Sequence, residues 1–306
     1  MRLEGMRDGG QVTVDGRFPR RNADDGGPAA LVHVTAERLA LDEELRAAVS
    51  ALSADIRDTV DSLGLEGEFG VDVTTWRDQG ADTFGYDVRV DVEDGRIQLA
   101  DLPLPTTALR GPVFVHGEDG QNRVEIAAVR GVIENGADRE PAALTLHGTV
   151  DVGARGIATD LSAVVRGLEL TPRLGHAVDA FGAFEFETWD LLDPSGQVDL
   201  VWRRVQEPAE EAPHQTLRIQ LLDVRSAAEF LPAPAEHVFG DVLVVDGRTT
   251  FSDVRAQMAG AEVQCIEGSV TQAGTERVFE VLVSSPDFPV DDRIGRLLDG
   301  PIAETW

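Results

Sequence analysis

The stretch that decides the fold, residues 86–93, reads Tyr86-Asp87-Val88-Arg89-Val90-Asp91-Val92-Glu93. Apolar and charged residues alternate without a break, so successive side chains fall on opposite faces of an extended chain. This period of two predicts a β-strand with one apolar and one solvated face. The next two residues, Asp94-Gly95, are typical of a tight hairpin turn and predict that residues 96–99 return as a second strand.

The same alternation recurs along most of the chain, separated by turn residues. It predicts a mainly β protein with a few helices. The further strand candidates are residues 111–116, 123–133, 143–150, 157–170, 197–203, 216–224, 242–245, 249–257, 261–270 and 277–283.

Three segments carry helix signals. Residues 42–63 begin at Asp42, a residue type that caps helix N-termini, and continue with apolar residues at helical spacing. Residues 172–181 follow Thr171, and residues 292–298 follow Asp291, with the same start pattern. We therefore expect three helices at these places.

Each predicted helix follows a similar short sequence motif. The motifs end at Leu41-Asp42, Leu170-Thr171 and Val290-Asp291. The apolar residues Leu41, Leu170 and Val290 lie 129 and 120 residues apart. Other segments keep similar spacings, for example residues 110–113 with 239–242 and residues 146–150 with 266–270. The pattern predicts a repeat of about 120 residues. Residues 1–63 would be the tail end of one truncated unit with a long helix, residues 64–189 a first near-complete β-repeat, and residues 190–306 a second, cut at the start of the next unit.

The composition argues against several classes of function. The chain has 27 basic and 55 acidic residues, a formal net charge of −28, and every basic residue is an arginine. Without lysine there is no Walker-type phosphate loop and no Schiff-base chemistry. So negative a chain is a poor partner for nucleic acid. We therefore expect neither nucleic-acid binding nor enzymatic activity.

Metal and catalytic patterns are missing as well. The single cysteine, Cys265, excludes a cysteine-ligated zinc or iron–sulfur site, and the six histidines form no closely spaced pair. Carboxylates are so numerous that a glycosidase-type pair stays open on sequence alone. We expect no catalytic residue, no metal and no cofactor.

Strands with one apolar and one charged face are compatible with two architectures. In the first, the units join edge to edge into one repeated, strongly curved antiparallel sheet that forms an elongated groove, a β-taco. In the second, each unit closes into its own β-sandwich, giving tandem sandwiches. Few helices would leave much of a long sheet uncovered, which favours the groove. The predicted groove lining is Val88, Val90, Val92, Leu144, Leu146, Leu161, Val165, Leu217, Ile219 and Leu221.

Several short motifs together resemble a known family. They are the Gly-x-Val-Asp-Val/Leu phrase, the Leu-x-Leu-Thr/Asp helix start and the junction Trp189-Asp190-Leu191-Leu192-Asp193-Pro194-Ser195-Gly196. In this order they resemble the repeats of the AsmA-like superfamily of envelope proteins, which includes TamB and YhdP and is related in style to bridge-like lipid transfer proteins. The resemblance implies a taco-shaped β-groove that holds lipid acyl chains in the periplasm, with an N-terminal membrane anchor that this sequence lacks.

The expected function follows from the resemblance and the one-faced strands together. We expect a fragment of a large envelope protein of a diderm bacterium, anchored in the inner membrane through its other parts, for lipid transport between membranes or outer-membrane biogenesis. Its expected partners are lipid, through phospholipid acyl chains, and other envelope proteins, with membrane contact only through parts absent here. The alternative is a structural or adhesive β-repeat protein of the cell surface with no ligand.

Overall fold

The computed structural model describes residues 2–7, 10–17, 30–40, 66–77, 83–97, 105–135, 139–172, 174–175, 193–208, 210, 212–228, 231, 233–246, 248–273 and 276–288. These residues form one antiparallel sheet of 15 strands, in which each strand pairs with its neighbours in the chain. The strands are β1 (Arg2–Arg7), β2 (Gly10–Arg17), β3 (Ala30–Ala40), β4 (Glu68–Arg77), β5 (Gly85–Ile97), β6 (Thr106–Glu118), β7 (Gln121–Ile133), β8 (Ala142–Gly153), β9 (Gly156–Glu169), β10 (Pro194–Gln206), β11 (His214–Ser226), β12 (Ala235–Val245), β13 (Arg248–Met258), β14 (Ala261–Ala273) and β15 (Glu276–Ser284).

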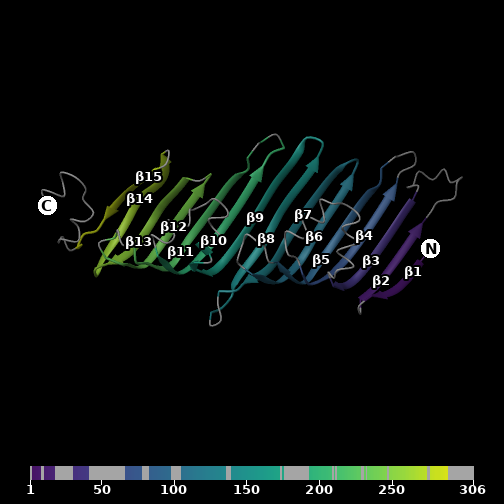
Figure 1. The fold of residues 1–306 in the computed structure, drawn as a ribbon, viewed down its shortest axis with the longest axis horizontal. Coiled ribbons are helices and arrows are strands. Elements are labelled where there is room, and N and C mark those ends of the chain that lie inside the picture. Colours follow the sequence, from purple (N-terminus) through teal and green to yellow (C-terminus); the bar gives the residue numbers. More distant parts are fainter. Residues whose placement is uncertain are drawn as a thin grey trace.

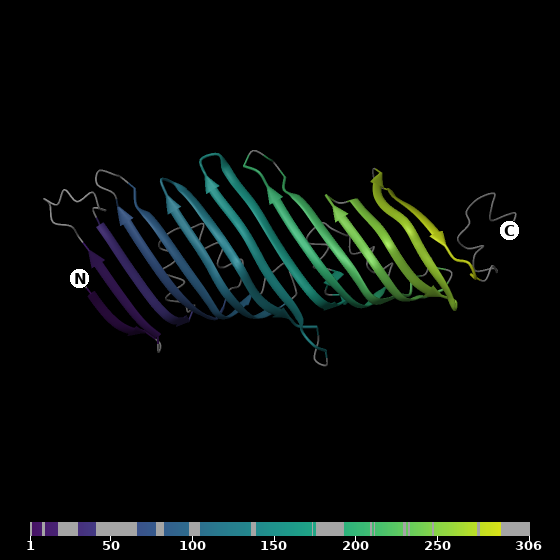
Figure 2. The ribbon, with the colours of Figure 1, turned by 180° about the vertical axis from the view of Figure 1, so that it is seen from behind.

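The sheet is long and curved, with β1 at one end and β15 at the other (Figure 1). With neighbouring strands about 4.8 Å apart, fifteen strands extend over about 65 Å. The view from behind shows the strands running side by side without a second sheet stacked against them (Figure 2). The prediction of a mainly β, strongly curved sheet is confirmed, and the alternative of tandem sandwiches is wrong for the described residues.

The register assigns the two faces of the sheet. Val73, Val88 and Val115 lie opposite one another on β4, β5 and β6, so their side chains share one face. Asp72 and Arg89, also cross-strand partners, share the other. We call the first the inner face and the second the outer face. The alternation quoted for residues 86–93 therefore separates an apolar from a charged face, as predicted.

The expected hairpin at Asp94-Gly95 is wrong. Strand β5 continues to Ile97, and its pairing with β6 shifts register between Val92 and Gly95. A Cβ at Gly95 would lie 2.7 Å from Val92 Cγ1 and 3.1 Å from Leu109 Cβ, so glycine is needed here for packing. The Asp-Gly pair thus serves a β-bulge, which bends the strand instead of reversing it.

Similar irregularities recur along the sheet at matching intervals. Gly111 (φ +140°) and Gly240 (φ +146°), 129 residues apart, each lie against the backbone of the next strand. Ala108 and His237, also 129 residues apart, both have a φ of +52°. Strands β5 and β11, which begin at Gly85 and His214, keep the same interval. The bulges therefore bend corresponding strands alike, while the three-unit division of the chain remains a prediction.

The expected helices lie mostly outside the described residues. This holds for residues 42–63 and 292–298. Of the third, Pro172, Leu174 and Gly175 are described and are helical. The Leu174 N–H donates to Thr171 Oγ1 over 3.3 Å and the Gly175 N–H to the Thr171 carbonyl over 3.1 Å, so Thr171 caps this turn.

The buried core lies mainly beside the β-bulges. Most of it lies on the inner face toward the rim that carries the longer connections, where the strands bend, whereas Leu217 and Val244 lie toward the opposite rim. Its members are Leu109, Val129, Ile133, Ala142, Leu144, Val165, Leu168, Leu174, Val198, Leu217, Val224, Ala235, Val238, Val244, Met258 and Val263. Leu174, in the helical turn that follows β9, is buried against this part of the sheet. Toward the opposite rim the inner face is only partly buried from β5 to β10, whereas Leu217, Val244 and Thr249 on β11 to β13 are buried there too.

Candidate functional site

The candidate site is the inner face. All ten predicted lining residues lie on it, because the register links them across strands. Leu144 opposes Val165. Val165 in turn opposes Leu200, whose other partner is Ile219. The alternating residues of β5, β8, β9 and β11 therefore form one apolar surface.

The lining residues differ in how deeply they are buried. Leu144, Val165 and Leu217 belong to the buried core, and Val92, Leu146, Ile219 and Leu221 pack against it while remaining partly exposed. Val88, Val90 and Leu161 are half-buried and lie outside this cluster. From β5 to β10 the inner face is thus closed at the bulges and more open toward the short hairpins, and this open half is the part that we consider as the candidate site.

The open half reaches the rim formed by the short hairpins. Ile157, at the start of β9, is 50% exposed, and Phe84, just before β5, is 57% exposed. Tyr86 lies over Gly117, and its hydroxyl donates to Asn122 Oδ1 over 2.6 Å. An apolar surface that stays partly exposed over many strands is a typical feature of a binding surface.

Charge is nearly absent from the inner face. Among the paired residues of β4 to β14 on this face within the described chain, Arg77 and Arg204 are charged. Arg77 ends β4, with its guanidinium carbon 5.4 Å from the centre of the Phe84 ring. Arg204 lies on β10, directly opposite Leu161 and Gln215. The sequence prediction missed Arg204, although its place two residues after Trp202 in an alternating strand assigns it to this face.

Arg204 has an unusual environment. Its Nε is buried and has no hydrogen-bond partner, and the same holds for Thr159 Oγ1. Thr159 faces Gln206, the inner-face residue that follows Arg204 on β10. A donor and a hydroxyl without partners therefore lie diagonally across neighbouring strands on an otherwise apolar surface.

The outer face, in contrast, pairs many of its charges. Arg203 donates to both Asp160 oxygens, at 3.0 and 2.9 Å, and Arg218 donates to Asp241 over 2.9 Å. Hydrogen bonding between the two side chains, with Arg203 as the donor, lowers the pKa of Asp160 and raises that of Arg203. These pairs link adjacent strands across the solvated face.

Histidine–aspartate pairs link further neighbouring strands. Imidazole and carboxylate atoms lie 2.9 Å apart for His33–Asp72, 2.6 Å for His116–Asp87 and 2.8 Å for His237–Asp223. A fourth pair, His214–Asp246, is separated by 3.1 Å; its hydrogen bond with Asp246 is the main cause that raises the pKa of His214. These histidines stabilise strand pairing, and the described residues include no cluster of three or more potential metal ligands.

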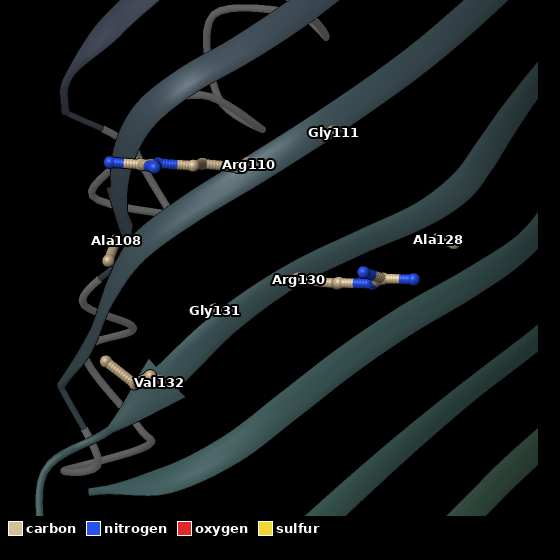
Figure 3. Close-up of a pocket in the computed structure, with 7 residues that line it drawn as sticks. All are labelled: Ala108, Arg110, Gly111, Ala128, Arg130, Gly131 and Val132. Carbon is tan, nitrogen blue, oxygen red and sulfur yellow. The ribbon is translucent and has the colours of Figure 1, made fainter.

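Two hollows lie away from the apolar strip. One, of about 490 Å³, is lined by seven residues of β6 and β7, where Arg110 and Arg130 extend in opposite directions (Figure 3). The other, of about 480 Å³, lies at the rim between the β6–β7 and β8–β9 hairpins and has a mixed lining that includes Arg123, Asp151 and Val152. Since the two arginines of the first diverge, they do not form a single anion clamp.

Cys265 on β14 does not have a reactive environment. Burial raises the pKa of its thiol, which keeps it protonated at neutral pH. Its Sγ lies 3.5 Å from the Glu267 carbonyl oxygen. Among the described residues, no helix combines the length and hydrophobicity needed to cross a bilayer.

The comparisons with known proteins add no relative: no protein-family model, curated protein or solved structure matches the chain.

Proposed function

We propose that this chain holds lipid acyl chains against the inner face of its sheet, as a segment of an AsmA-like envelope protein. The observation that carries the proposal is the shared inner face of all ten predicted lining residues, part of which stays half-exposed. Acyl chains need such a surface, because each buried methylene group contributes about 0.8 kcal/mol.

The shape of the molecule supports the same function. A continuous sheet of 15 strands offers an apolar strip along about 65 Å, far longer than one small-molecule pocket requires. The charged outer face keeps this surface in solution, and like charges discourage sheets from associating. In this proposal the periplasm is the compartment, phospholipid the ligand class, and the chain has no catalytic role.

The test compares acyl-chain binding by two aspartate variants. Val90→Asp places a carboxylate on the open half of the inner face and should abolish binding of a fluorescent fatty acid. Val201→Asp is the matched control, because Val201 is 42% exposed on the outer face of β10. It should bind as the unmodified chain does.

Circular dichroism of both variants completes this test. We expect the strand signal of Val90→Asp to persist, since Val90 is half-buried and lies outside the core cluster. If the variant unfolds, Val90 instead belongs to a closed core, which favours the structural or adhesive repeat. Unchanged fatty-acid binding by a folded Val90→Asp variant would also contradict the proposal.

A further inference from the structure

Arg204 is a charged residue on the inner face, and the binding of acyl chains proposed above gives it no role. A guanidinium has five N–H donors and stays charged at any physiological pH. Arg204 has no ion pair or hydrogen bond with the described residues, and its Nε is buried. Buried polar groups normally have partners, so the unpaired Nε of Arg204 requires an explanation.

The polar and acidic side chains around the end of β10 make hydrogen bonds with groups other than Arg204. The neighbouring Gln215 accepts from Trp202 Nε1 over 3.4 Å, and Gln206 donates to the Glu210 carbonyl over 3.4 Å. The carboxylate of Glu210 accepts from the Glu207 N–H, and that of Asp246 bonds the Gln215 N–H. The nearby acidic side chains therefore already have partners.

The position of Arg204 suits the polar end of an amphiphile. It lies two residues before the end of β10, near the rim of short hairpins, and directly opposite Leu161. From Leu161, the apolar residues of β9 continue away from the rim through Ala163 to Val165. An acyl chain on this strip would bring its head group to Arg204 and to the free hydroxyl of Thr159.

We infer that Arg204, assisted by Thr159, binds the anionic oxygens of a lipid head group, either a carboxylate or a phosphate. Arg204 would donate charge-assisted hydrogen bonds and Thr159 would donate its hydroxyl proton. The inference rests on the proposed function and adds a head-group preference to it. It also gives this strongly acidic chain one local site where an anion is favoured.

The experiment uses three amphiphiles with the same oleyl chain: oleate, oleoyl lysophosphatidate and oleyl alcohol. Their affinities are measured by displacement of a fluorescent fatty acid from the full chain. We expect at least one of the two anions to bind about tenfold more tightly than the alcohol, the gain typical of a hydrogen bond to a charged group. The stronger anion identifies a carboxylate or a phosphate as the ligand.

Three variants test whether Arg204 and Thr159 cause this preference for anions. Arg204→Met should bind the anions no better than the alcohol while still binding the alcohol. The control Arg203→Met removes the same charge from the same strand but on the outer face, where Arg203 pairs with Asp160, and should keep the preference. Thr159→Val should reduce the preference partially.

The outcomes separate the two proposals. If the unmodified chain binds all three amphiphiles equally, or Arg204→Met keeps the anion preference, the groove stands and the role of Arg204 is wrong. If none of the three binds, the groove itself is wrong. An Arg204→Met variant that is folded by circular dichroism excludes unfolding as the cause of a lost preference.

Discussion

At the scale of single residues, glycines decide where the strands can bend. Gly240 has a φ of +146°, and a Cβ there would lie 2.7 Å from the Val254 Cα on β13. Both the backbone conformation and the close approach exclude a side chain. A sequence alone shows that a glycine interrupts an alternating run, but not that the next strand touches it.

Replacing Gly240 by alanine should therefore destabilise β12 and β13 by about 1–3 kcal/mol, the range for strained backbone positions. Hydrogen exchange at the amides of these strands measures the loss directly. Gly5→Ala is the control, because no atom lies within 4 Å of the Cβ that it adds. Equal protection in the two variants would show that the bulge tolerates a side chain.

His214 gives a pH-dependent prediction. Its folded-state pKa is raised, mainly by the hydrogen bond with Asp246, so its contribution is fully present below its unfolded pKa of about 6.5 and is lost as the pH rises through the folded value. The pKa of Asp246 is lowered, first by the Gln215 N–H, so its contribution is lost only in acid. The pair thus stabilises the link between β11 and the end of β12 at mildly acidic pH.

His214→Gln should therefore reduce the thermal midpoint at pH 5.5 and leave it nearly unchanged at pH 8.5. Differential scanning calorimetry at the two pH values checks this. The variant retains a polar side chain at a solvent-exposed position, so a large loss at pH 8.5 would mean that packing rather than charge explains the role of His214.

At the scale of elements, the connection between β7 and β8 is tied to the end of β9 by one side chain. Asn135 Nδ2 donates to the carbonyls of Glu140 and Gly167, at 2.7 and 2.8 Å, and its Oδ1 accepts from the Glu169 N–H over 3.0 Å. Gly167 also donates its N–H to Asp199 Oδ1 on β10 over 2.8 Å. This network holds the bulge where β9 leads into the turn capped by Thr171.

Asn135→Ala removes all three bonds and should speed hydrogen exchange of the Glu169 amide by tenfold or more, since each bond contributes about 1 kcal/mol. Asn135→Asp keeps the acceptor for that amide and should protect it better than alanine. Identical exchange in both variants and the unmodified chain would contradict the role of this network.

The elements that could be predicted from the sequence are those that a local pattern specifies. Period-two alternation at residues 86–93 gave a strand and its faces, and Thr171 gave a helix cap. The hairpin prediction at Asp94-Gly95 was wrong because an Asp-Gly pair suits both a hairpin turn and a β-bulge. Only the pairing of Gly95 with Leu109 on the next strand distinguishes the two. Arg204 was missed because its lack of a partner depends on the neighbouring strands, which no local pattern contains.

At the scale of the whole molecule, charge and hydrophobicity are separated across one continuous sheet. In the described part of the chain, the paired inner-face residues of β4 to β14 include no carboxylate, whereas outer-face carboxylates such as Asp160 and Asp241 pair with arginines across strands. From β5 to β10 the inner face has a buried half near the bulges and a partly exposed half near the short hairpins. A two-layer sandwich would have buried both halves, whereas a groove that holds a removable ligand keeps one half accessible.

The most direct measurement is native mass spectrometry of the purified chain, combined with organic extraction and identification of any lipid. Because the inner face is largely apolar from β4 to β14, we expect lipid to co-purify with the chain, and we expect Val90→Asp but not Val201→Asp to reduce its amount. Ligand-free protein that also takes up no lipid from added vesicles would contradict the account.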